Sequence, residues 1–243
     1  MIFSIHIPKT AGTSFRNALQ ARYGDRLALY YGPNDPATHP LLRRASRKSL
    51  AAHVPRLEDH GIEVLHGHYV LPLVETAVTD PSKQLWTWLR DPVERIISHY
   101  SYIRERPTKW SFDEEIKAGE LSLLKFSAMR RFRNLHSQYL RGIDIEEFGF
   151  VGLSERFELG LGMLFGEDAP QLPRRYNATD DKLEADEATR DRIHALNLDD
   201  YKLYGRAART LIDRVAASRD IVTPARPDKA GASLVKRLIR KVQ

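Results

Sequence analysis

Residues 2–14 read IFSIHIPKTAGTS, and this stretch decides the fold class. Its first six residues are mostly apolar and rich in β-branched side chains, which predicts a short buried strand that ends at Pro8. Apolar residues recur at helical spacing over residues 13–23, so a helix is predicted there, and Gly24 ends it. A strand, a loop of small residues and a helix, in this order, form the unit from which parallel α/β sheets are built.

The same alternation continues along the chain. Further strands are predicted at residues 63–66, 84–90 and 148–153. Helices are predicted at residues 41–57, 92–104, 112–140, 155–165 and 199–217. Strands that alternate with helices predict an α/β fold with one central parallel sheet, helices on both faces, and a single domain over residues 1–220.

The composition is that of a soluble globular chain. The 243 residues include no cysteine, which excludes a disulfide framework, a thiolate nucleophile and a cysteine-ligated metal. The longest mainly apolar stretches, residues 70–78 and 159–165, are far shorter than the roughly 20 residues of a membrane span. The N-terminus lacks the pattern of a signal peptide. We therefore expect a cytoplasmic protein.

The positive charge is concentrated at the C-terminus. Residues 221–243 carry +5 of the formal net charge of +6, which leaves the body close to neutral. A near-neutral body argues against nucleic acid as a partner. Within this basic tail, residues 232–243 place apolar side chains on one helical face and basic side chains around the rest. Such an amphipathic helix either lies on an anionic membrane as a peripheral contact or packs on the body or on a partner.

The loop after the first strand, residues 8–14, has the chemistry of a phosphate cradle. A helix N-terminus offers backbone N–H groups and a partial positive charge, Lys9 adds a full charge, and the loop's threonine and serine residues supply hydroxyls. It is not a Walker A sequence, because the lysine stands at the start of the loop and no glycine precedes it. An ordinary capped helix after a turn is the alternative.

Residues 6–14, HIPKTAGTS, resemble the 5′-phosphosulfate-binding loop of sulfotransferases that use 3′-phosphoadenosine 5′-phosphosulfate (PAPS). More narrowly, they resemble the branch that contains the uronyl and heparan sulfate 2-O-sulfotransferases. The resemblance implies a P-loop-kinase-like sulfotransferase fold, PAPS as donor, adenosine 3′,5′-bisphosphate (PAP) as product, and no metal. It assigns donor binding to Lys9, Thr10, Ala11, Gly12, Thr13, Ser14, Arg90 and Ser98.

A second motif, LRDPVERIISHY at residues 89–100, supports the resemblance. In the family, an arginine at a strand end and a serine eight residues later hold the 3′-phosphate, and Arg90 and Ser98 keep this spacing. A planar guanidinium grips phosphate through two hydrogen bonds, and a hydroxyl adds a donor. Alternatively, Arg90 forms a surface ion pair and Ser98 is solvated. Asp91 either caps the helix that follows or imitates the carboxylate of a nucleotide-dependent kinase.

His66-Gly67-His68 lies at the end of the second predicted strand. Histidine titrates near neutral pH, so it can take a proton from an attacking hydroxyl. By the resemblance, His66 is the catalytic base, His68 is a supporting catalytic residue that orients the acceptor or the base, and Lys9 is the third catalytic residue. A pair of metal ligands is the alternative, for which the sequence offers no third ligand nearby.

Together these motifs predict a sulfotransferase that moves the sulfuryl group of PAPS to an acceptor hydroxyl by in-line displacement. The expected acceptor is a saccharide, a lipid-linked hydroxyl or a small alcohol. Residues 150–157 and 173–179 are similar, less specifically, to later segments of the same family. Two alternatives stay open: a nucleotide-dependent kinase, which would need magnesium, and a non-catalytic module that binds the nucleotide.

Overall fold

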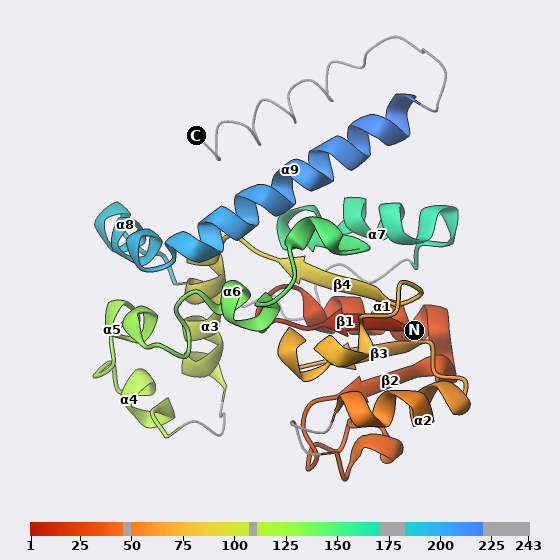
Figure 1. Ribbon diagram of the computed structural model, residues 1–243. Helices are drawn as coiled ribbons and strands as arrows, with labels where there is room; N and C mark the ends of the chain where they lie inside the picture. The colour runs from red at the N-terminus through yellow and green to blue at the C-terminus, as the bar shows by residue number, and fades with distance from the viewer. Residues whose placement is uncertain (46–49, 107–110, 171–182, 221–243) are drawn as a thin grey trace.

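Five parallel strands form the central sheet of the computed structural model, which describes residues 1–45, 50–106, 111–170 and 183–220 (Figure 1). In their order across the sheet, the strands are β2 (Leu27–Tyr30), β3 (Val64–Gly67), β1 (Ile2–Ile5), β4 (Gln84–Leu89) and β5 (Phe150–Leu153). Each strand is parallel to its neighbours. The predicted α/β class with one parallel sheet is therefore confirmed.

Helices connect the strands and extend the chain beyond them. Those in the described residues are α1 (Gly12–Tyr23), α2 (Val54–Asp59), α3 (Pro92–Glu105), α4 (Asp113–Lys117), α5 (Leu123–Ala128), α6 (Leu135–Leu140), α7 (Phe157–Phe165), α8 (Glu187–Leu196) and α9 (Leu198–Asp220). Short 3₁₀ turns lie between several of them.

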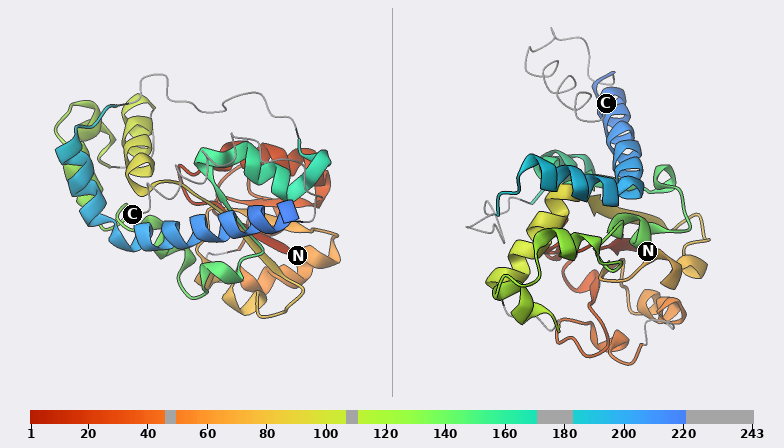
Figure 2. Two further views of the ribbon diagram at one scale, coloured as in Figure 1. Left: turned by 90° about the horizontal axis from the view of Figure 1, so that it is seen from above. Right: turned by 90° about the vertical axis from the view of Figure 1, so that its left-hand side faces the viewer.

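These helices cover both faces of the sheet, as predicted. On one face, Phe15 of α1 and Leu161 of α7 pack with Trp88 of β4. On the other face, apolar side chains of α2, α6 and α9 pack with Phe3 and Ile5 of β1. The burial of these side chains is the main source of stability for such a layered fold. Figure 2 shows the long helix α9 lying along the sheet in a view turned from that of Figure 1.

A third core cluster lies among the helices at one end of the sheet. It joins Ile96 and Ile97 of α3 with Ile116 of α4, Phe126 of α5 and Ile193 of α8. In Figure 1 these four helices gather beyond the end of the sheet at which β4 leads into α3. Because this cluster holds α3 firmly, the side chains that α3 presents to the strand ends have a rigid support.

The predicted helix at residues 41–57 is wrong. The chain instead forms a 3₁₀ turn at Pro40–Leu42, a second one at Ala51–His53 and the six-residue α2; residues 46–49 are outside the described part. Pro55 explains the break, because a proline has no N–H to donate and suits only the first turn of a helix.

Other predicted elements differ in extent. The strand β2 and the helix α8 were not predicted, and the predicted helical region at residues 112–140 divides into α4, α5 and α6. The basic tail with its expected helix at residues 232–243, and residues 173–179, lie outside the described residues. In the part of the chain that the structure describes, no helix is both long and apolar enough to cross a membrane.

Candidate functional site

The three polar motifs meet at the carboxyl ends of neighbouring strands. The order β3-β1-β4 puts the loop after β1 between the histidines at the end of β3 and Arg90 just after β4. Arg90 Nη1 donates a hydrogen bond to the Lys9 carbonyl at 3.3 Å, and His68 Nδ1 lies 2.8 Å from the His6 carbonyl oxygen. The carboxyl edge of a parallel sheet is where open α/β proteins bind ligands. The residues predicted from separate motifs thus lie together at one edge of the sheet.

Two non-glycine residues of the loop adopt left-handed backbone conformations. Lys9 has a φ of 71° and Ala11 a φ of 64°. Such conformations cost on the order of 1 kcal/mol or more each, and they occur where a loop must present its N–H groups to an anion. Between them, Thr10 is 1% exposed and donates its hydroxyl to the Ile7 carbonyl at 2.9 Å. The Thr10 hydroxyl therefore stabilises the loop through a hydrogen bond to the residue that precedes it.

Helix α1 begins without a side-chain cap. The N–H of Phe15 makes the first hydrogen bond of the helical ladder, so the N–H groups of Gly12, Thr13 and Ser14 precede that ladder. Such a helix N-terminus attracts anions. Gly12 has a second role, because a Cβ atom at this position would lie 1.7 Å from His6 Nε2. A glycine is needed here to seat the His6 ring against the start of the helix.

Positive charge gathers around the Lys9 ammonium. Burial and the charges of Arg90 and Arg106 lower the pKa of Lys9 to about 8, and the charge of Glu105 opposes them. Within the described residues, no carboxylate lies within ion-pair distance of Lys9 or of Arg90. Like charges held together are unfavourable, so this arrangement suits a site that binds an anion.

Arg90 lies between β4 and the cap of α3, and Ser98 lies in the second turn of α3. Asp91 caps this helix by accepting a hydrogen bond from the Glu94 N–H at 3.0 Å. Both Asp91 carboxylate oxygens also lie 3.2 Å from the Tyr201 hydroxyl of α9. Asp91 thus has the capping role that was one of its predicted alternatives. Ser98 is 6% exposed, so its side chain is largely buried.

His66 lies beneath the site. It is 1% exposed, and its Nδ1 lies 2.8 Å from Ser4 Oγ on β1. Burial lowers the pKa of His66 to about 3, with smaller effects from the charges of His68 and Arg16. Its Nε2 is buried without a hydrogen bond of normal geometry, and the Gly12 backbone, which favours the protonated ring, opposes the shift. His66 is therefore neutral at physiological pH and is closed off from solvent.

The imidazole rings form a stack. His6 lies between the other two, with ring centroids 5.2 Å from His66 and 4.1 Å from His68. Burial also lowers the pKa of His6 well below its usual value, and the charges of the other two histidines add to this effect. Because His68 is only partly buried, it is the member of the stack that reaches the surface.

Tyr31, which directly follows β2, completes this side of the site. Its ring lies edge-on to His68 at 5.0 Å between centroids, its hydroxyl lies 3.4 Å from His6 Nδ1, and the Arg16 guanidinium lies 5.9 Å from its ring centroid. Burial raises the pKa of Tyr31 to about 12 despite the Arg16 charge. Tyr31 was not among the predicted site residues, because β2 is only four residues long. The signal was its position directly after LALY, residues 27–30.

The glycine between the two histidines is required by the sheet. A Cβ atom at Gly67 would lie 1.8 Å from the Tyr30 carbonyl oxygen of the neighbouring strand β2. We expect Gly67→Ala to separate β2 from β3 and to lower the free energy of unfolding by about 1–3 kcal/mol, the range for overpacking. Thermal unfolding followed by circular dichroism measures the change.

Gly162→Ala is the matched control for this substitution. Gly162 lies in α7, and nothing would lie within 4 Å of a Cβ atom there. Because alanine suits a helix interior better than glycine, we expect this change to raise the free energy of unfolding by up to about 1 kcal/mol. A Gly67→Ala protein as stable as the control would show that the close approach of β2 is unimportant.

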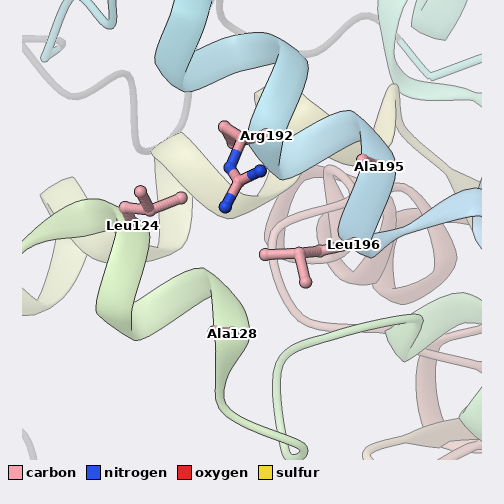
Figure 3. A pocket seen from close by; sticks show the side chains of 5 residues that line it. All are labelled: Leu124, Ala128, Arg192, Ala195 and Leu196. Carbon is pink, nitrogen blue, oxygen red and sulfur yellow. The ribbon is translucent and has the colours of Figure 1, made fainter.

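Two cavities among the described residues lie away from the three motifs. One of about 280 Å³ lies between α5 and α8 and is lined by Leu124, Ala128, Arg192, Ala195 and Leu196 (Figure 3). A second, of about 580 Å³, is lined by Met129, Arg130, Arg131 and Gln138. Neither contains a residue of the three motifs, so the convergence of side chains locates the candidate site. In the described ranges, no group of three or more histidines and acidic residues is arranged to hold a metal ion.

Comparison with known proteins returned no matching family and no matching curated protein. Among solved structures, a sulfotransferase from Alicyclobacillus acidocaldarius is 18% identical, with a TM-score of 0.44 over 84% of this chain and 94% of its own. The mouse sulfotransferase SULT7A1, complexed with PAP, is 10% identical, with a TM-score of 0.39 over 84% of this chain and 64% of its own. Likenesses this remote carry no conclusion about function, although both of these structural neighbours are sulfotransferases.

Proposed function

We propose that this chain is a sulfotransferase that uses PAPS as donor and a hydroxyl as acceptor. The observation that carries the proposal is the convergence of the loop at residues 8–14, Arg90 and His68, which are joined through the Lys9 and His6 carbonyl groups. The reaction needs a cradle for the 5′-phosphosulfate, a guanidinium for the 3′-phosphate and a base for the acceptor proton. These three groups lie on three neighbouring strand ends.

The charges of the site support a polyanionic ligand. Lys9, Arg90 and Arg106 are close enough to affect one another, since the two arginines lower the pKa of Lys9. In the proposal, Lys9 and the first N–H groups of α1 hold the 5′ end of the donor, while Arg90 and Ser98 hold its 3′-phosphate. A ligand with phosphates at both ends would neutralise this charge, which a single phosphate does less completely.

His68 is the base in this proposal. A carbonyl oxygen only accepts hydrogen bonds, so the 2.8 Å contact with the His6 carbonyl requires a proton on His68 Nδ1 and puts the lone pair on Nε2. The resemblance implied His66 instead. Because His66 is 1% exposed, we assign it the role of support beneath the stack.

In the proposed reaction, the acceptor oxygen bonds to sulfur as the bond from sulfur to the bridging phosphate oxygen breaks. The hydroxyl proton passes to His68 Nε2, and PAP is the leaving group. Lys9 and the loop N–H groups stabilise the negative charge that grows on the bridging oxygen. Arg90 and Ser98 act at the far end of the nucleotide, where binding energy serves alignment.

Isothermal titration calorimetry with PAP is the first test. Without magnesium, we expect PAP to bind about 10- to 100-fold more tightly than AMP or ATP, because the 3′-phosphate adds charge-assisted hydrogen bonds. Arg90→Ala should remove most of this preference. Arg209→Ala, at an exposed position on α9, is the control and should leave it unchanged.

Each alternative function predicts a different result. Equal affinity for PAP and AMP, or a preference for ATP once magnesium is present, contradicts the proposal and favours a kinase. Tight binding of PAP without sulfate transfer from PAPS to any saccharide, lipid-linked or small-alcohol acceptor favours a non-catalytic binding module.

A further inference from the structure

The side chain of Lys9 rests on an aromatic ring of α3. Its Nζ lies 4.0 Å from the centroid of the Tyr102 ring. The Arg106 guanidinium carbon lies 5.1 Å from the same centroid. A cation within about 6 Å of an aromatic centroid is attracted by the negative face of the ring. Tyr102 thus contacts the lysine of the candidate site directly, although it belongs to none of the three sequence motifs.

The helix that carries Tyr102 also carries the proposed contact to the 3′-phosphate. Ser98 and Tyr102 are four residues apart in α3, so they lie on the same side of the helix, one turn from each other. Ile96 and Ile103 of the same helix are fully buried in the core cluster of α3, α4, α5 and α8. The ring is therefore presented to Lys9 from a well-packed helix.

Lys9 has few other favourable neighbours. Burial and the charges of Arg90 and Arg106 disfavour its protonated form, and the charge of Glu105 opposes them. No carboxylate among the described residues lies within ion-pair distance of Lys9 Nζ. The face of the Tyr102 ring is the direct contact that favours the ammonium.

Two histidines lie close enough to Lys9 for its charge to affect their pKa values. The Lys9 charge contributes to the lowered pKa of His6, which precedes the loop, and of His99, which lies on α3. Burial is the largest cause of both shifts, and both imidazoles are neutral at physiological pH. Neither histidine therefore adds a charge to the surroundings of Lys9.

We propose that Tyr102 is a positioning residue, whose ring face holds the Lys9 ammonium in the orientation needed to meet the bridging oxygen of the donor. This inference rests on the proposed function for its purpose, but the contact itself does not depend on that function. In the proposal, α3 serves both ends of the nucleotide, since Ser98 binds the 3′-phosphate and Tyr102 holds the lysine for the 5′ end.

Competitive labelling of Lys9 with acetic anhydride tests the contact without any activity. Only the neutral amine reacts, so the pH at which labelling reaches half its maximum reports the pKa, and fragment-ion mass spectrometry separates Lys9 from the N-terminal amine. We expect Tyr102→Leu to lower this pH by about half a unit, because the ring no longer favours the ammonium. Tyr102→Phe keeps the ring and should match the unmodified protein.

The possible results of the labelling experiment distinguish a failure of the contact between Lys9 and Tyr102 from a failure of the proposed function. An unchanged pH in Tyr102→Leu, or the same shift in Tyr102→Phe, contradicts the inference even if PAP binds. If the pH of half-maximal labelling shifts as expected but the protein does not bind PAP, the contact between Lys9 and Tyr102 is supported and its role in donor binding is contradicted. If Tyr102→Leu does not fold, Tyr102→Met is the second variant without a ring, since its flexible side chain fills irregular space.

With an active protein, the kinetic constants supply a second test. Tyr102→Leu should lower kcat about 2- to 10-fold, the loss expected when one exposed to partly buried cation–π contact is removed. The KM for PAPS should change less than twofold, because Arg90 and Ser98 stay in place. Tyr102→Phe should restore kcat, whereas a merely structural role for the tyrosine would change stability and both constants together.

Discussion

Replacing His68 by alanine should lower the rate of PAP release from PAPS by about 10²- to 10⁴-fold, the contribution of a positioned general base. The expected loss follows from the tautomer of His68. The His6 carbonyl holds the proton on His68 Nδ1, which leaves Nε2 to take the proton of the attacking hydroxyl. Its stacked neighbours compete poorly for that proton, because burial lowers the pKa values of His6 and His66 and so makes both rings weaker bases. The assay uses the acceptor that gives the unmodified protein its fastest turnover.

Two controls distinguish a lost base from a damaged site. The Kd for PAP and the melting temperature of His68→Ala should match those of the unmodified protein, because His68 is partly exposed and is not assigned to donor binding. Added imidazole should restore part of the lost rate, which a structural defect would not allow.

The parallel variant His66→Ala decides between the two histidines. Its expected result is a lower melting temperature without rescue by imidazole, since it removes a buried ring that packs against His6 and contacts Ser4. Rescue in His66→Ala, together with a rate within tenfold of normal in His68→Ala, would return the base role to His66.

The sequence predicts the layout of the fold because its signals are local. The loop at residues 8–14 follows an apolar strand and starts a helix, and Asp91-Pro92 marks the start of α3. Where a local signal is weak, the prediction fails. The four-residue β2 is too short to show a period, and the turns around Pro55 interrupt an apolar pattern that resembles a helix.

The roles within the site depend on contacts between distant segments. Ser4 and His66 are 62 residues apart, as are His6 and His68, so neither the burial of one histidine nor the tautomer of the other follows from the HGH motif alone. The contact of Tyr102 with Lys9 is equally remote in sequence. Its only local signal was the four-residue spacing from Ser98, which places both residues on one side of α3.

A buried polar cluster joins α3, α6 and α9 next to the site. Asp200 of α9 is fully buried and accepts hydrogen bonds from the N–H of His136 at 3.0 Å, the N–H of Ser137 at 2.8 Å and the hydroxyl of Ser137 at 2.9 Å. Arg95 of α3 is also fully buried and donates to the Phe132 carbonyl at 2.5 Å. Burial lowers the pKa of Arg95 to about 10, and the Asp200 charge opposes this shift.

His136 does not supply the positive charge for Asp200. Its Nδ1 lies 3.6 Å from Asp200 Oδ2, but burial lowers the pKa of His136 to about 4, so it is neutral at pH 7. Arg95 is the buried cation whose charge interacts with Asp200, and among the described residues its Nε and Nη1 have no hydrogen-bond partner. The cluster therefore depends on one carboxylate.

Asp200→Ala should lower the free energy of unfolding by about 3–5 kcal/mol, because it leaves a buried guanidinium without its counter-charge and removes the acceptor of two backbone N–H groups. For a chain of this size, the melting temperature should fall by roughly 10 °C or more. Asp213→Ala is the matched control: Asp213 is exposed on the same helix, and its change should stay within about 0.5 kcal/mol.

A double substitution identifies the origin of the loss. If the uncompensated charge of Arg95 is the main cost, Arg95→Met in the Asp200→Ala background should recover part of the stability, since an apolar side chain of similar length fills the same space without a charge. If the two losses simply add, the broken hydrogen bonds to α6 account for the effect and the charge interaction is negligible. A loss below about 1 kcal/mol in Asp200→Ala itself would contradict both origins.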